Sequence, residues 1–207
     1  MNFLPRLWCV TLVLLVGCTS IPTVNLKPIN SRQLIKMEFG RAFFAPGESG
    51  DDRIVLVSDP IDQPTEAAPG DALAVATSPP IWQVLLIQLH WRTSASPKED
   101  SLVANNAVLH WYVYGKPTST GMGVLHYIGS GSVSVSTDST GADVVINHAD
   151  LKLAERHGDI HDPFQAFQIK TDFRAETDPA RLNQSMDDVE KAISQADQRT
   201  TAAATLP

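Results

Sequence analysis

The sequence predicts a mainly β protein, an antiparallel β-sandwich or barrel-like domain with one C-terminal α-helix. Short apolar segments of strand composition recur between residues 34 and 175, and turn residues separate them. No helical period lies between these segments, which favours antiparallel strands over a parallel sheet. A single stretch near the C-terminus has the 3.6-residue apolar period of a helix.

The first predicted strand covers residues 34–39, where three apolar residues alternate with charged ones. A period of two is typical of a strand with one buried face. Turn-forming residues fill positions 45–52, and residues 53–57 form a second short apolar segment. The sequence therefore predicts a hairpin of these two strands, and we expect the folded domain to begin at Leu34.

Residues 59–80 contain five prolines around a short apolar run at 72–76. Proline removes a backbone donor and fixes φ, so a continuous central strand is not expected here. A loop of this length is often functional. The segment is a candidate contact surface or, equally, a surface insertion without function.

Five further strands are predicted downstream. The first is a near-continuous apolar run that fits a strand buried on both faces. Gly129 and Gly131 indicate a bulge or bend in the third, and the fourth is expected to bend near residues 147–150. The predicted ranges are 81–91, 106–114, 122–136, 142–153 and 164–175.

The predicted helix begins after Asp178, which offers an N-cap ahead of Pro179 at the first helical position. An apolar stripe follows, formed by Leu182, Met186, Val189 and Ile193. This stripe is expected either to cover a face or open end of the sheet, or to serve as a handle for a partner groove. Residues 197–207 lack any pattern and are expected to be disordered.

The N-terminus has the pattern of a secretory signal. Arg6 and the amino terminus give a positive start, and residues 9–16 form an apolar core that is too short to span a bilayer. Residues 15–18, Leu-Val-Gly-Cys, resemble the lipobox of bacterial lipoproteins. That resemblance covers the first 18 residues only, and it implies cleavage between Gly17 and Cys18. It also implies a diacylglyceryl group on Cys18 and an acyl chain such as palmitate on the new amine.

The same resemblance implies a place in the cell envelope. Thr19 follows the cysteine, and in enteric lipoproteins a residue other than aspartate there favours the outer membrane, facing the periplasm. The chain then divides into a signal peptide (1–17), a lipidated tether (18–33), a single β-rich domain with its helix (34–196) and a disordered tail (197–207). An ordinary cleaved signal peptide with an incidental cysteine is the alternative.

Composition limits the classes of partner. The formal charge is −7 and no basic cluster is visible, which argues against nucleic acid and against electrostatic binding to anionic lipid. Of the two cysteines, Cys9 leaves with the signal and Cys18 is acylated, so the mature domain is expected to have no disulfide. Two or more acyl chains hold a protein stably to a membrane, and the sequence predicts that these chains alone do so.

Histidines supply the metal-site candidates. A Leu-His-aromatic triplet occurs three times, around His90, His110 and His126. Three imidazoles on one face suffice for zinc or copper if the three strands are neighbours in register. His157 and His161, with Asp162, form a second candidate on one loop. In the competing interpretation, the histidines of the triplets are polar residues on the solvent face of their strands, and His157 and His161 belong to a polar surface loop.

No catalytic motif is visible, since the sequence has no Gly-x-Ser-x-Gly elbow, P-loop or dinucleotide fingerprint. Our first hypothesis is a non-enzymatic envelope lipoprotein that acts as a binding or structural module for a protein or glycan partner. The second is a periplasmic metal-binding protein that uses the histidines above. The third is a hydrolase whose carboxylates assemble from distant strands. No cofactor and no catalytic residue is predicted.

Overall fold

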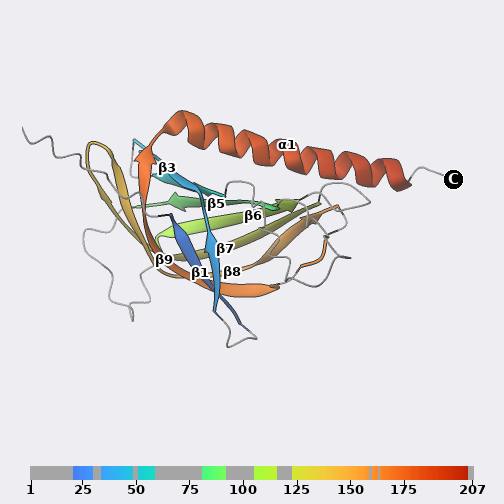
Figure 1. Cartoon of the computed structure of the whole chain (residues 1–207), viewed down its shortest axis with the longest axis horizontal. Helices are drawn as coiled ribbons and strands as arrows, with labels where there is room; N and C mark the ends of the chain where they lie inside the picture. The colour runs from blue at the N-terminus through green and yellow to red at the C-terminus, as the bar shows by residue number, and fades with distance from the viewer. Residues whose placement is uncertain are drawn as a thin grey trace, which may run out of the picture.

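The computed structural model describes residues 21–29, 34–48, 51–58, 81–91, 105–115, 123–158, 160–162 and 164–204. This part of the chain forms nine strands and one helix (Figure 1). Their bounds are β1 Thr23–Pro28, β2 Ile35–Glu38, β3 Arg41–Ala45, β4 Arg53–Val57, β5 Ile81–Leu89, β6 Ala107–Gly115, β7 Gly123–Thr137, β8 Gly141–His157, β9 Ala166–Thr177 and α1 Pro179–Ala204. The predicted mainly β class with one C-terminal helix is confirmed.

The nine strands form one mixed sheet instead of two stacked sheets. From β3 to β9 each strand pairs antiparallel with the next in the chain. The last residues of β9 pair in parallel with β3, where Phe43 lies opposite Glu176, so these seven strands close into a ring. The earlier part of β9 pairs with β1, which pairs in turn with β2. The fold is therefore closer to the barrel-like alternative than to the sandwich.

The inner face of the curved sheet carries the main core. Trp111 and Tyr127 are its largest fully buried side chains. The ring of Phe167 meets both, with centroids 5.2 Å from Trp111 and 5.0 Å from Tyr127. Leu109 and Trp111 have no exposed surface, and Val113 packs against the same cluster. The alternation of side chains along β6 therefore places these three residues inside.

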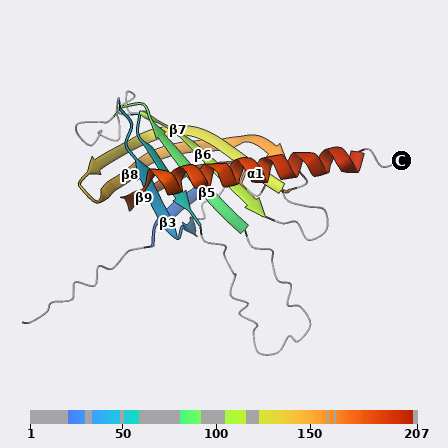
Figure 2. The same cartoon turned by 90° about the horizontal axis from the view of Figure 1, so that it is seen from above.

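Helix α1 covers the part of the outer face formed by β3, β4 and β5, and Figure 2 shows it running across the strands. Asp178 caps its start, because Oδ1 accepts a hydrogen bond from the N–H of Arg181 at 3.0 Å. Leu182 and Val189 are buried in a second cluster with residues of β3, β4 and β5. The predicted stripe thus covers a face of the sheet. It also explains why β5 is buried on both faces, as its apolar run indicates.

Strand β1 corrects the predicted tether. It lies inside the segment 18–33, yet Val24 and Leu26 have no exposed surface and the strand pairs on both sides. The signal in the sequence is weak because only two apolar residues alternate there, between Pro22 and Pro28. The fold therefore includes β1 and does not begin at Leu34.

The predicted hairpin of 34–39 with 53–57 is also wrong. Strand β4 pairs with β3, and β2 pairs with β1. Strand β3 shows no alternation of apolar and polar residues, because its four apolar residues 42–45 are all buried, on both faces of the sheet. The turn lies between β3 and β4, where the N–H of Gly47 donates to Oδ1 of Asp52 at 3.1 Å.

At the other end of the chain, α1 continues to Ala204, so most of the predicted disordered tail is helical. Three alanines at 202–204 favour the helix without contributing to an apolar stripe. The bend predicted at residues 147–150 is a shift of register between Ile146 and Ala149. The signal peptide and the predicted loop 59–80 lie outside the described residues.

Candidate functional site

Histidines from two of the three triplets meet on the outer face of the sheet. Nδ1 of His110 on β6 lies 3.0 Å from Nε2 of His126 on β7. The two are diagonal neighbours, since His126 lies opposite Tyr112 and His110 lies opposite Ile128. The ring of Tyr112 stacks on His126 with centroids 4.4 Å apart. The hairpin register of β6 and β7 therefore brings the two imidazoles together.

This contact continues into β8 and α1. Nδ1 of His126 lies 3.5 Å from Oε2 of Glu155, and Nε2 of His157 lies 3.5 Å from the same oxygen. Nδ1 of His157 then lies 2.9 Å from Oδ1 of Asp197 on α1. We call this set of five side chains the histidine row: His110, His126, Glu155, His157 and Asp197.

Burial and neighbouring charge shift the protonation of the row. Desolvation lowers the pKa of His110, and the charge of His126 lowers it further. The hydrogen bond from His126, the charge of His126 and the contact with His157 lower the pKa of Glu155. Glu155 is therefore a carboxylate at neutral pH. Either ring can donate in the 3.0 Å contact between His110 and His126, according to their tautomers.

His90 does not join the row. Its backbone N–H donates to the carbonyl of Asn106, beyond the end of β5, whereas His110 lies opposite Leu86 in the middle of the β5–β6 ladder. The register thus places the His90 triplet several residues along the sheet from the triplets of His110 and His126. The imidazole of His90 therefore does not lie beside those of His110 and His126.

The second metal candidate, His157 with His161 and Asp162, is not assembled either. Asp162 is used by the fold, because Oδ1 accepts from the Tyr127 hydroxyl at 2.5 Å and from the N–H groups of Phe164 and Gln165. In the described part of the chain, no group of three or more His, Cys, Asp or Glu side chains is placed to hold a metal ion.

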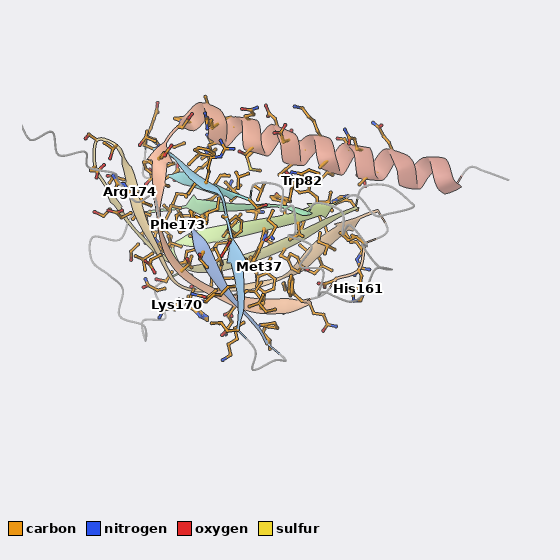
Figure 3. All side chains as sticks on the ribbon, viewed as in Figure 1. Met37, Trp82, His161, Lys170, Phe173 and Arg174 are labelled. Atoms are coloured by element: carbon orange, nitrogen blue, oxygen red, sulfur yellow. The ribbon has the colours of Figure 1, made fainter. Side chains whose placement is uncertain are left out.

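A pocket of about 490 Å³ lies on the outer face of β1, β8 and β9. Lys170, which lines it, lies on the side of the sheet away from α1 (Figure 3). The lining is Asn25, Lys27, Leu34, Asn147, His148, Gln168, Ile169 and Lys170. We call this the lysine pocket, because its two ammonium groups are its strongest hydrogen-bond donors.

Cross-strand register builds one side of the lysine pocket. Asn25 lies opposite Lys170, and Lys27 lies opposite Gln168, in the antiparallel ladder of β1 and β9. Residues directly opposite each other share a face of the sheet. Two lysines and two amides therefore form a square of donors on the outer face.

A bulge in β8 builds the other side. Two residues, Asn147 and His148, face the single residue Lys170 between the paired positions on either side of the register shift. Bulges of this kind re-aim side chains and are common beside functional sites. Nε2 of His148 lies 2.9 Å from Oδ2 of Asp150, and Nδ2 of Asn147 donates to Oγ of Ser134 at 3.4 Å.

Lysines from four strands gather on this face. Lys36 on β2 lies opposite Asn25, and Lys152 on β8 lies opposite Ala166. With Lys27 and Lys170 they make four of the seven lysines in the chain. Strand pairing thus places on one surface lysines that are far apart in the sequence and that form no cluster along the chain. We call this surface the lysine face.

None of the polar residues that line the lysine pocket is predicted as a site residue from the sequence. The lysines on β1 and β9 are separated by most of the chain, and only the pairing of those strands brings them together. The only signal in the sequence is that polar residues alternate with apolar ones along each strand. Any strand with one face in solvent shows the same pattern.

Comparison with protein-family models, with curated proteins and with solved structures finds no match to this chain. The described residues include no helix that is long and apolar enough to cross a membrane.

Proposed function

We propose that this protein is a lipoprotein of the bacterial cell envelope that works by binding and not by catalysis. Acyl chains on Cys18 hold its β domain at the membrane surface, on the periplasmic side of the outer membrane. The observation that supports the proposal is the position of the lipobox-like residues 15–18 relative to the fold. Strand β1 begins at Thr23, only five residues after the cysteine. The lipid anchor would thus be joined almost directly to a paired strand.

The lysine pocket supplies the binding chemistry of the proposal. The ammonium groups of Lys27 and Lys170 and the amides of Asn25 and Gln168 are donors for an anionic or polyhydroxylated ligand. The volume of the pocket, about 490 Å³, falls within the range of roughly 300–1,000 Å³ found for small-ligand sites. A polar component of the envelope is the class of ligand that fits such a lining.

Metal binding at the histidine row is a second candidate, and one observation favours it. In a tetrahedral site, two nitrogens that ligate the same zinc ion at about 2.0–2.1 Å lie about 3.3 Å apart, and the His110 and His126 nitrogens are 3.0 Å apart. A stable site needs at least one further protein ligand. The nearest carboxylate, Glu155, faces the other nitrogen of His126. We therefore favour the hydrogen-bonded pair over the metal site.

Metabolic labelling tests the lipoprotein proposal. Cells of the native host are grown with an alkyne-bearing fatty acid, and the label on the protein is measured for wild type, Cys18→Ser and Cys9→Ser. Cys18→Ser is expected to lose the label, because the thiol accepts the lipid. Cys9→Ser keeps it, because residue 9 leaves with the signal. Label that survives in Cys18→Ser contradicts the proposal.

A further inference from the structure

We propose that the lysine face rests on the same membrane that holds Cys18, with the lysine pocket bound to the phosphate of an anionic phospholipid headgroup. This inference rests on the proposed function, because it assumes that Cys18 is acylated. It adds the orientation of the domain on the bilayer and the class of ligand in the pocket.

The length of chain after the anchor limits where the domain can lie. Consecutive Cα atoms are 3.8 Å apart, so the Cα atom of Ile21 lies within about 11 Å of that of Cys18. Ile21 leads directly into β1, whose outward-facing residues Asn25 and Lys27 line the pocket. The strand nearest to the anchor thus forms part of the lysine face.

Exposed apolar side chains border this face. Among the described residues, the exposed large apolar side chains are Ile21, Ile29, Leu34, Val145 and Trp91. The first four belong to β1, β2 and β8 or adjoin them, and Ile21, Ile29 and Leu34 are each more than half exposed. Val145 lies opposite Asp172 on β9, two positions from Lys170. Apolar side chains gathered on one surface indicate an interaction site, and acyl chains of a bilayer provide an apolar environment for them.

The charges on this face suit anionic headgroups. Four lysines lie there, with three carboxylates: Glu38, Asp150 and Asp172. Asp150 is paired with the imidazole of His148 at 2.9 Å. Farther along β8 and β9 the same face also carries Asp143, Arg174 and Glu176. The excess of lysines over carboxylates is therefore confined to the surroundings of the pocket, on a chain whose formal charge is −7. Lysines at a membrane surface are attracted to anionic lipids, whereas the rest of this protein is repelled by them.

The pocket itself favours a phosphate held at a membrane over a free anion. Lys27, Lys170 and the amides offer charged and neutral donors to phosphate oxygens. Leu34 lies at the same pocket with its side chain exposed to solvent. A soluble anion makes no use of that apolar neighbour, whereas a headgroup enters the pocket while its acyl chains contact the leucine.

A single-cysteine label tests the orientation. Cys18 is the only cysteine of the mature chain and is acylated in the proposal, so Ile29→Cys adds the one free thiol. The full lipidated protein is labelled with an environment-sensitive fluorophore and placed in phosphatidylcholine vesicles with or without phosphatidylglycerol. We expect a blue shift and loss of quenching by an aqueous quencher, both larger with phosphatidylglycerol. Asn183→Cys, exposed on α1, is the matched control and stays accessible to the quencher.

Two double variants then test the pocket. Lys27→Gln with Lys170→Gln removes the charges that line it, whereas Lys36→Gln with Lys152→Gln removes the same charge from the surrounding face. We expect the first pair to abolish the effect of phosphatidylglycerol on the Ile29→Cys label, and the second pair to keep most of it. Equal losses in both pairs show diffuse attraction and overturn the headgroup site.

Other outcomes separate this inference from the proposed function. A label at residue 29 that is quenched as fully as the one at residue 183, on a protein shown to be acylated, overturns the inference and leaves the lipoprotein proposal intact. Inorganic phosphate that raises the melting temperature, while vesicles leave the residue 29 label unchanged, assigns the pocket to a free anion and also overturns it. Absence of acylation removes both proposals.

Discussion

Nδ1 of His157 lies 2.9 Å from Oδ1 of Asp197, and this contact joins β8 to α1 across 40 residues of chain. The helix buries Leu182 and Val189 in its first half, and Ala192 and Ala196 pack in a smaller cluster farther along. This contact is partly exposed, with 18% of the His157 side chain and 57% of the Asp197 side chain accessible. Its main effect is thus expected to be local order in the second half of the helix.

Asp197→Asn is expected to speed hydrogen exchange of the amides around and beyond residue 190 while lowering the free energy of unfolding by less than about 1 kcal/mol. Asp188→Asn is the control, because the Asp188 carboxylate pairs with Lys191 of its own helix, at 3.4 Å. Exchange that is equally fast in both variants shows that the contact with β8 does not order the helix.

Trp111→Ala is expected to lower the free energy of unfolding by about 3–5 kcal/mol. The side chain is fully buried and contacts Phe39 and Phe167. Trp91→Ala removes the same side chain where 47% of it is exposed, and is expected to cost about 0.5 kcal/mol. Urea denaturation followed by circular dichroism gives both values, and similar costs for the two variants contradict the described core.

Leu26→Ala is expected to lower the free energy of unfolding by about 2–5 kcal/mol, because β1 belongs to the sheet and this leucine has no exposed surface. Lys27→Ala, its outward-facing neighbour, is expected to change it by about 0.5 kcal/mol or less. A neutral Leu26→Ala would restore the interpretation of this segment as a tether.

The sequence predicted the strands from β4 onward well, apart from their ends, because apolar alternation and turn residues are clear there. It failed at β1 and β3, where the strands are short and show two or four apolar residues without a usable period. The failure at β1 matters most for the proposed function, because β1 supplies Asn25 and Lys27, two of the eight residues that line the lysine pocket. A site that depends on pairing between the first and last strands has no local signature.

The histidine triplets also show that a local sequence pattern does not predict which side chains meet. Identical local patterns on three consecutive strands give no register, and register decides which side chains meet. His110 and His126 meet because His126 lies opposite Tyr112 in the β6–β7 ladder, and Tyr112 is two residues from His110 on the same face. His90 follows the last paired residue of β5 and is therefore displaced along the sheet.

Gly129→Ala is expected to destabilise the fold by about 1–3 kcal/mol, as for overpacking in a filled site. A Cβ atom at this position would lie 1.8 Å from the carbonyl oxygen of Asp150. Ser130→Ala, at the exposed next position, is the control and is expected to be nearly neutral. Equal melting temperatures for Gly129→Ala and Ser130→Ala would contradict the close approach of β7 and β8 at this point.

The low pKa of His110 predicts that stability falls at mildly acidic pH. The native state binds fewer protons than the unfolded state between the folded-state pKa of His110 and the usual histidine pKa of 6.5. The contribution is therefore complete above about pH 6.5 and is lost as the pH falls through that value towards the folded-state pKa. Melting temperature from about pH 7.5 to 5.5 measures it. His110→Gln should flatten the profile more than His148→Gln, an exposed histidine; equal slopes for His110→Gln and wild type argue against this assignment.

The mass of the N-terminal peptide of the protein from its native host tests the central claim most directly. The account predicts a chain that begins at Cys18, with residues 1–17 removed, a diacylglyceryl group on the sulfur and an acyl chain on the amine. A mature chain that begins at another residue, or a Cys18 with a free thiol, contradicts it.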